Sequence, residues 1–397
     1  MKRYREDFLI LQKRIKGKPI VYLDNACMTL KPVQVVNKIN EYYNEYPACG
    51  GRSQHKLGQQ VTLWTDESRK TAAKFFNAKK PSEIIFTRNT TEGINLISHS
   101  LDFKQGDTVL TTDREHNSNL IPWQVNKTIK HNITPSKDDG TFDMDAFKAK
   151  LTKNVKLVSV VHTSNLDGYT LPVKDIINLA HDNGSLVLLD AAQSAPHQEI
   201  NVKKLDVDFL ACSGHKMVGP TGTGILYGKE KHLEKLKPFM VGGETVTDST
   251  YDSQTFEKIP QKFEAGLQDY AGIIGLGEAF RYLRKVGMSD IHDHEIKLHK
   301  LIAGELASEH KINSLNPAAQ KSGIYTFNIE GMDTHMIALM LDKTANIAIR
   351  SGHHCVHSWF NARKINGAAR ASLYFYNTKE ECRQFCEEVK KIAKHFA

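Results

Sequence analysis

A lysine past the middle of the chain occupies a position where an amine nucleophile could act. Lys216 follows the apolar run 207–212 and the residues Ser213-Gly-His215, and a glycine-rich loop at 219–224 comes next. A lysine at the mouth of a buried strand is partly desolvated, which lowers its pKa and makes the amine available for a Schiff base. The alternative is a surface lysine in a turn. The loop lacks the Gly-Lys-Ser/Thr ending of a nucleotide P-loop, so its glycines do not decide between the two.

Acidic, hydroxyl and imidazole side chains follow other apolar runs. Asp190 ends the run 186–190, where a carboxylate suits the protonated ring nitrogen of pyridoxal phosphate; a helix N-cap is the alternative. Thr90 and Thr91 place hydroxyl and backbone N–H groups where a phosphate can bind, although an N-cap beside Glu92 explains them equally well. His116 could lie over a cofactor ring or move protons, whereas most lone histidines are structural.

A cysteine surrounded by histidines closes an apolar strand near the C-terminus, in the segment Arg350-Ser-Gly-His-His-Cys355. Consecutive residues point in different directions and rarely ligate one ion, so we predict no metal site here. A thiol in such polar, basic surroundings is typical of a nucleophile, and the alternative is an inert buried cysteine. Arg350 and Arg370 could each bind a substrate carboxylate with both guanidinium arms, or form an ordinary surface salt bridge.

Strands that alternate with helices must position these residues. Between residues 83 and 227, short β-branched runs alternate with segments of helical period, which predicts an α/β fold with a mainly parallel sheet. In such sheets ligands bind beyond the carboxyl ends of the strands. We therefore expect five strand ends to converge on one site, namely 89–92, 115–119, 162–165, 190–194 and 213–216.

The pattern changes after residue 266. Helical periods at 270–285 and 290–310, a further helix around Met336, short strands and a charged terminal helix predict a smaller α+β domain. We predict three parts: an N-terminal segment (1–20) that packs with the small domain, a large cofactor-binding domain (21–288), and a small C-terminal domain (289–397) that carries the nucleophilic cysteine.

The composition is that of an ordinary globular protein. The 397 residues include 53 Lys plus Arg and 45 Asp plus Glu, scattered rather than clustered, for a net charge of +8. No apolar stretch approaches the roughly 20 residues of a membrane span, and only residues 8–11 resemble a signal core, so we predict a cytoplasmic protein. The six cysteines form no CxxC pair and should be thiols. A non-catalytic sulfur carrier or nucleic-acid-binding protein would explain the charge but none of the strand-end residues.

Ordered motifs along nearly the whole chain resemble one enzyme family. They are Asp24-Asn-Ala, Phe86-Thr-Arg-Asn-Thr-Thr-Glu-Gly-Ile-Asn95, Glu115-His116, Pro122-Trp-Gln124, His162-Thr-Ser-Asn165, Asp190-Ala-Ala-Gln-Ser-Ala-Pro196, Ser213-Gly-His-Lys216, Phe263-Glu-Ala-Gly266, Arg350-Ser-Gly-His-His-Cys355 and Arg370-Ala-Ser372. Together they resemble the fold-type I pyridoxal-phosphate enzymes of aminotransferase class V. The short segment from Cys355 to Arg370 and the long one at 243–263 are similar to the group II, SufS-type cysteine desulfurases.

The resemblance implies a large domain with a mainly parallel seven-stranded sheet, a smaller α+β C-terminal domain, and pyridoxal 5'-phosphate as the cofactor. It implies that Lys216, His116 and Cys355 are catalytic, with Lys216 joined to the cofactor and His116 stacked on its ring. The implied cofactor-binding residues are Thr90, Thr91, His116, Asn165, Asp190, Gln193, Ser213, His215 and Lys216. The implied substrate-binding residues are Asn165, Arg350, Arg370, Arg52 and His55.

The resemblance also implies a reaction and its partners. L-Cysteine would become L-alanine, and its sulfur would pass to Cys355 as a persulfide for iron–sulfur cluster assembly or another sulfur compound. A homodimer and a sulfur acceptor, either a SufE- or SufU-type protein or the iron–sulfur scaffold, are implied as well. The alternatives are a selenocysteine lyase, a cysteine-sulfinate desulfinase, and a divergent class V aminotransferase or kynureninase relative.

Three departures from the family pattern concern the substrate region. Cys27 and Met28 follow Asp24-Asn-Ala where many relatives have Ala-Thr, and Leu267 follows Phe-Glu-Ala-Gly where relatives commonly have threonine. Asp167 is expected to add negative charge close to the site. None of these departures removes a predicted catalytic group.

Overall fold

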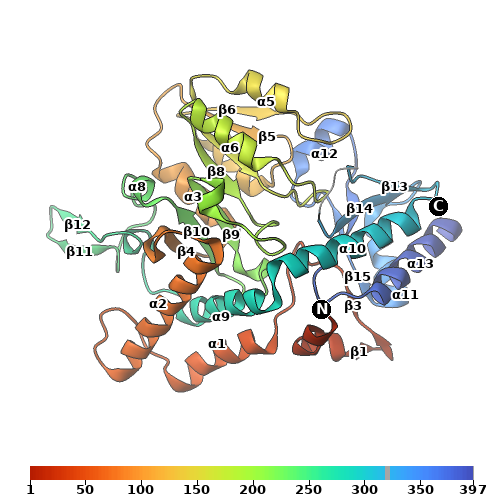
Figure 1. Cartoon of the computed structure of the whole chain (residues 1–397), viewed down its shortest axis with the longest axis horizontal. Helices are drawn as coiled ribbons and strands as arrows, with labels where there is room; N and C mark the ends of the chain where they lie inside the picture. Colours follow the sequence, from red (N-terminus) through yellow and green to blue (C-terminus); the bar gives the residue numbers. More distant parts are fainter. Residues whose placement is uncertain (318–321, 397) are drawn as a thin grey trace.

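Seven strands form one large sheet in the computed structural model, which describes residues 1–317 and 322–396 (Figure 1). Their spatial order is β4 (Ile84–Thr87), β10 (Gly224–Gly228), β9 (Phe209–Ser213), β8 (Leu186–Asp190), β7 (Val155–Val161), β5 (Thr108–Thr112) and β6 (Lys130–Thr134). Within this sheet β10 runs antiparallel to both of its neighbours, while β9, β8, β7, β5 and β6 pair in parallel. The prediction of a mainly parallel seven-stranded sheet is confirmed.

Successive residues of the strands pack on opposite sides of the large sheet. In β8, Val187 and Leu189 belong to one apolar cluster and Leu188 to another. The first cluster includes residues of α2 (Lys56–Phe76), α5 (Met144–Lys150), α6 (Val173–Asp182), α7 (Val202–Leu205) and α9 (Tyr270–Val286). The second includes residues of α3 (Thr90–Ser100), α4 (Ile121–Val125) and α8 (Glu230–Leu233). Because both faces are covered, ligands reach this sheet at its strand ends.

A second sheet of four antiparallel strands lies in the C-terminal part of the chain, in the order β13 (Ile312–Ser314), β14 (Ile324–Ile329), β17 (Ala368–Ser372) and β16 (Arg350–Gly352). Its apolar core includes residues of α10 (Met288–Leu306), α11 (Thr334–Ala345) and α13 (Lys379–Phe396). The smaller α+β domain is thereby confirmed. Of its predicted helices, the one expected at 290–310 begins at Met288 and ends at Leu306.

The N-terminal residues lie between the two parts. Arg5 donates hydrogen bonds to the Tyr376 carbonyl and to Glu381, and Tyr282 of α9 donates one to Asp7. The segment contains η1 (Lys2–Asp7), η2 (Leu9–Gln12) and the paired strands β1 (Arg14–Ile15) and β2 (Lys18–Pro19). Next come β3 (Val21–Tyr22), which pairs in parallel with β15 (Ile347–Ala348), and α1 (Val33–Glu45). The boundaries at residues 20 and 288 stay predictions.

A hairpin of β11 (Val246–Ser249) and β12 (Gln254–Phe256) projects from the large domain, at the far left of Figure 1. Most of its residues are exposed. Among residues 1–317 and 322–396, no helix combines the length and the apolar character that a membrane crossing requires.

Candidate active site

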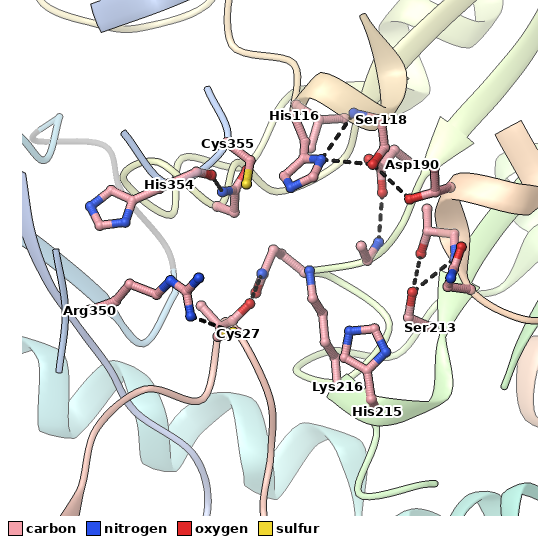
Figure 2. Close-up of a pocket in the computed structure, with 18 of the residues that line it drawn as sticks. Cys27, His116, Ser118, Asp190, Ser213, His215, Lys216, Arg350, His354 and Cys355 are labelled. Atoms are coloured by element: carbon pink, nitrogen blue, oxygen red, sulfur yellow. Dashed lines mark hydrogen bonds between the residues drawn. The ribbon is translucent and has the colours of Figure 1, made fainter. Parts of the chain in front are cut away.

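One cavity of about 240 Å³ lies where the two domains meet (Figure 2). The carboxyl ends of β4, β5, β7, β8 and β9 supply one wall, and β16, β17 and the segment after β16 supply the other. Parallel strands end at the same edge of a sheet, which explains why distant segments meet here. The predicted site residues that line the cavity are Thr90, Thr91, His116, Asn165, Asp190, Gln193, Ser213, His215, Lys216, Arg350, Cys355 and Arg370.

Lys216 and Asp190 place an amine and a carboxyl group in the interior of this cavity. Lys216 ends the 3-10 turn η5 (Gly214–Lys216) directly after β9. Burial lowers the pKa of the Lys216 ammonium, and the Asp190 carboxylate opposes that shift only in part. Burial raises the pKa of Asp190, whose Oδ1 accepts a 2.9 Å hydrogen bond from the Ala192 N–H. Burial thus pushes both groups toward their neutral forms.

His116 is held in one tautomer by a serine. Its Nδ1 accepts the backbone N–H of Ser118 at 3.1 Å, and the Ser118 hydroxyl lies 2.9 Å from the same nitrogen. The proton of the neutral ring is therefore assigned to Nε2. Burial, together with the nearby charge of Lys216, lowers the pKa of His116 to about 3, so the ring is neutral at physiological pH. Ser118 was not predicted as a site residue, although it lies in the polar strand-end cluster 115–119.

The N-terminus of α3 lines one end of the cavity with hydroxyl groups. The Thr90 N–H donates to Ser213 Oγ at 2.9 Å, and the two hydroxyl oxygens lie 2.7 Å apart. Thr91 Oγ1 lies 2.7 Å from Ser118 Oγ. Burial lowers the pKa of His215 to about 4, and the charge of Lys216 adds to that shift. Hydroxyl groups beside the N–H groups of a helix N-terminus suit a phosphate.

The small domain adds a buried arginine to the opposite wall. Arg370 Nη1 donates to the Asn165 carbonyl at 2.7 Å, and Nη2 lies 3.7 Å from Asp24 Oδ1. Gln193 donates from Nε2 to the Ala26 carbonyl at 2.6 Å. In the described part of the chain, Arg370 Nε, Asn165 Oδ1 and Gln193 Oε1 are buried without a hydrogen-bond partner. Buried polar atoms are normally paired, so these three suit a polar ligand in the cavity.

Cys355 lies on a tight turn and presents an exposed thiol. Both His354 (φ 48°) and Cys355 (φ 59°) adopt the left-handed backbone conformation, which non-glycine residues rarely adopt. The Asn117 N–H holds this turn by donating to the Cys355 carbonyl at 2.8 Å. Strained backbone of this kind often occurs at functional sites. Across the described residues, no three His, Cys, Asp or Glu side chains group as metal ligands would.

Arg350 contacts a thiol other than the predicted nucleophile. Its Nη1 lies 2.8 Å from Cys27 Sγ and 3.7 Å from Asp24 Oδ2. Cys27, predicted to lie near the substrate region, lines the cavity beside Arg350 (Figure 2). His354 also lines the cavity, although the sequence did not predict it as a site residue.

Arg52 and His55, predicted to bind the substrate, do not line this cavity of the single chain, and their role stays a prediction. Arg52 is exposed and donates to the Val246 carbonyl at 3.3 Å. His55 caps α2 by accepting the Gly58 N–H at 3.3 Å.

The fold and the lysine-centred cavity define a class of protein. The Aminotransferase class-V family matches residues 21–385, and the chain belongs to this family. A probable cysteine desulfurase from Synechocystis sp. is 41% identical over 99% of this chain and 96% of its own length.

Two solved structures are similar over almost the whole chain. The apo cysteine desulfurase from Thermococcus onnurineus NA1 has a TM-score of 0.94 and 37% identity, and covers 99% of this chain and 98% of its own. The cysteine desulfurase CsdA from Escherichia coli, in its S-sulfonic acid form, has a TM-score of 0.90 and 30% identity, with the same two coverages.

Proposed function

We propose that this protein is a pyridoxal-phosphate-dependent cysteine desulfurase. It converts L-cysteine to L-alanine and stores the sulfur on Cys355 as a persulfide, for iron–sulfur cluster or other sulfur-compound assembly. The observation that carries the proposal is that an exposed thiol from the small domain and a lysine from the large domain line one cavity. An aminotransferase has no evident use for such a thiol.

The residues present fit the cofactor. Ser213, Thr91 and His215, with the first N–H groups of α3, would hold the phosphate. Asp190 would pair with the ring nitrogen, and the unpartnered Oε1 of Gln193 would accept a hydrogen bond from the ring hydroxyl. When bound, pyridoxal phosphate supplies an electron sink for the electron pair left on the substrate α-carbon.

Lys216 is proposed as the amine that joins the cofactor and then acts as the base. Its lowered pKa increases the fraction of neutral amine, which a nucleophile and a base both require. Once it is free, Lys216 Nζ would remove the proton from the substrate α-carbon. His116 would stack on the cofactor ring, and its neutral imidazole would add no positive charge there.

Arg370 and Asn165 are proposed to bind the substrate. The buried Arg370 guanidinium would bind the carboxylate of cysteine, and its Nε is available for that contact. Arg350 would approach the same region from the edge of the cavity, next to Cys27.

Cys355 completes the reaction as the sulfur acceptor. Its thiolate attacks the substrate sulfur, a new S–S bond forms, and the substrate Cβ–S bond breaks with its electron pair returning to carbon. One cysteine and one Cys355 thiol give one alanine and one Cys355 persulfide, so atoms and electrons balance. Because Cys355 is exposed, a thiol of an acceptor protein can reach the persulfide. We further propose that the protein acts as a homodimer in the cytoplasm.

The test compares the wild type with Cys355→Ala and Cys49→Ala, each supplied with three substrates in turn. Purified protein is incubated separately with L-cysteine, selenocysteine and cysteine sulfinate, while alanine release and the mass of the Cys355 peptide are followed. We expect Cys355→Ala to keep the yellow cofactor, form no persulfide and release little alanine from cysteine. Cys49→Ala is the matched control, because it removes an exposed thiol outside the cavity. Full alanine release by Cys355→Ala would contradict the proposal.

A further inference from the structure

The loop after β7 is a docking point for the small domain. Three successive carbonyl groups of residues 165–167 each accept a hydrogen bond from a small-domain side chain. The pairs are Asn165 with Arg370 Nη1 (2.7 Å), Leu166 with Thr326 Oγ1 (2.6 Å) and Asp167 with Asn316 Nδ2 (2.5 Å). Asn165 also donates from Nδ2 to the His354 carbonyl at 2.6 Å, one residue before Cys355. The position of this loop therefore bears directly on Arg370 and on the nucleophile.

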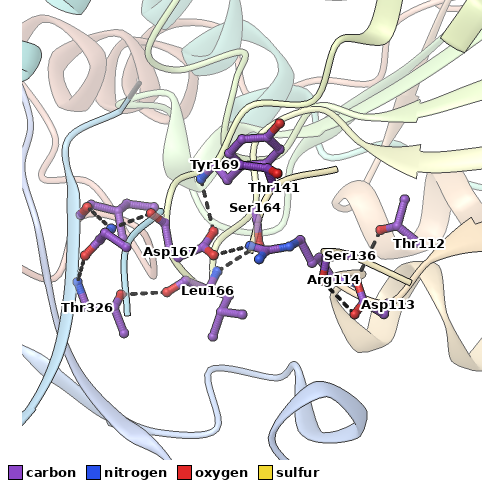
Figure 3. A network of polar contacts seen from close by, with 12 residues as sticks. Thr112, Asp113, Arg114, Ser136, Thr141, Ser164, Leu166, Asp167, Tyr169 and Thr326 are labelled. Carbon is purple, nitrogen blue, oxygen red and sulfur yellow. Dashed lines mark hydrogen bonds and ion pairs between the residues drawn. The ribbon is translucent and has the colours of Figure 1, made fainter. Parts of the chain in front are cut away.

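A buried ion pair holds the same loop from the side of the large domain. The Asp167 carboxylate pairs with the Arg114 guanidinium (Figure 3), and their side chains are only 1% and 3% exposed. Asp167 Oδ1 also accepts the Tyr169 N–H at 3.0 Å, which closes the turn of the loop. Arg114 stands two residues before His116, past the end of β5. One ion pair thus connects the loop that docks the small domain to the segment that carries His116.

The surroundings of Arg114 leave room for this pairing. Gly140 has a φ of +79°, and a Cβ at that position would lie 2.8 Å from Arg114 Nη2. The guanidinium also lies over the Tyr169 ring, 5.6 Å from its centroid. A glycine, an aromatic ring and a carboxylate together enclose the arginine.

We propose that the Arg114–Asp167 ion pair is a positioning device for the active site. It fixes residues 164–170, and through them it sets where Arg370 and the Cys355 turn stand relative to Lys216. Asp167 does not line the cavity, and its charge is neutralised by Arg114. This corrects the sequence-based expectation that Asp167 adds negative charge to the site. The inference rests on the proposed function where persulfide formation is measured, and amide hydrogen exchange tests it independently of that function.

Asp167→Asn tests the device with the smallest change. The asparagine oxygen can still accept the Tyr169 N–H, but the charge that pairs with Arg114 is lost. We expect single-turnover persulfide formation on Cys355 to slow about 10- to 100-fold, because misplacement of reacting groups by about 1 Å has effects of that size. We also expect amide hydrogen exchange to rise together in residues 164–170 and 352–358, whether or not the protein is supplied with cofactor.

Two further variants separate positioning from stability. Asp208→Asn removes an equally buried carboxylate at the opposite end of the large sheet, and should lower the unfolding midpoint without changing exchange in either segment. The double variant Arg114→Met/Asp167→Asn leaves no unpaired buried charge. It should recover most of the lost stability. It should not recover the slow amide hydrogen exchange of the wild type in residues 164–170 and 352–358, nor the wild-type rate of persulfide formation.

Each outcome decides the inference. The pair would only fill space if Asp167→Asn exchanged its amide hydrogens at the wild-type rates. The same would follow if the double variant recovered both the wild-type hydrogen exchange and the wild-type rate of persulfide formation. If Asp208→Asn increased amide hydrogen exchange in the same two segments, the cause would be a general loss of stability. If the wild-type protein converts no cysteine, the proposed function fails, while the exchange measurements still test the positioning device.

Discussion

Two aspartates at opposite ends of the large sheet are equally buried, yet their pKa values move in opposite directions. Asp190 at the carboxyl end of β8 and Asp208 just before β9 are each 2% exposed. Burial raises the pKa of Asp190, whose carboxylate accepts only the Ala192 N–H among the described residues. Burial also acts on Asp208, but hydrogen bonds from His232, Lys229 and His181 outweigh it and hold the pKa of Asp208 below its usual range.

The difference shows that partners, and not burial, separate a structural carboxylate from one that is available to a ligand. Asp208 has His181 Nε2 at 2.8 Å, Lys229 Nζ at 2.8 Å, and the Val187 N–H at 2.9 Å. These contacts join the amino ends of β8 and β9. Asp190 instead faces the cavity, where the charge of Lys216 offsets burial only in part, so a bound cation or a protonated ring would compensate its charge further. One end of the sheet is built for stability and the other for binding.

The largest expected effect is on stability, from Asp208→Asn. Removing the carboxylate of a buried charge cluster should lower the free energy of unfolding by about 3 kcal/mol, because several charge-assisted hydrogen bonds weaken at once, although Lys229 keeps its ion pair with Asp206. Alanine formation per folded molecule should equal that of the wild type. Urea unfolding measures the loss of stability, and an activity assay measures alanine formation. A large loss of activity in folded protein would contradict the assignment of a structural role to Asp208.

The same variant carries a pH signature. The folded-state pKa of Asp208 is lowered, so its contribution to stability is present above the unfolded value of about 3.8 and is lost as the pH falls below it. The difference in unfolding free energy between wild type and Asp208→Asn should therefore shrink as the pH falls below about 4. A difference that stays constant down to strongly acidic pH would exclude the ion pairs as its source.

The next effect is on activity, from Asp190→Asn. Alanine formation should fall about 10- to 100-fold, since a hydrogen bond to a charged group contributes about 1.5–3 kcal/mol and each 1.36 kcal/mol is tenfold in rate. In cofactor-free protein the variant should unfold at an equal or higher urea concentration than wild type, because burial of the Asp190 charge is no longer needed. A variant that is destabilised like Asp208→Asn would show that the two ends do not differ.

The smallest effect sharpens the binding end. Ser118→Ala removes the hydroxyl near His116 Nδ1 and Thr91 Oγ1, and keeps the backbone N–H that donates to His116 Nδ1. A neutral hydrogen bond contributes about 0.5–1.5 kcal/mol, so alanine formation should slow by about two- to tenfold. Steady-state rates measure this, with unfolding unchanged. No change in rate would show that the backbone N–H alone orients the imidazole.

Much of the site could be predicted because strand ends are visible in the sequence. The apolar runs that end at Asp190 and Ser213 mark β8 and β9, and parallel pairing then brings their ends to one edge. The role of Ser118 could not be predicted, because it depends on the direction in which the Ser118 backbone N–H points toward His116 Nδ1. Arg52 and His55 lie outside the cavity of the single chain, where Arg52 contacts the Val246 carbonyl and His55 the Gly58 N–H, and their role in substrate binding stays a prediction.

The sequence by itself determined the α/β class and many residues of the cavity wall, because periodicity and strand-end chemistry are local properties, and the family resemblance implied the seven-stranded sheet. Only the tertiary structure decided how charges are paired. Asp167, expected to charge the site, is neutralised by Arg114 from another strand end. Arg350 contacts Cys27 instead of Cys355. The physical reason is that a charge in the interior responds to neighbours within a few ångströms, and those neighbours come from segments that are far apart in the chain.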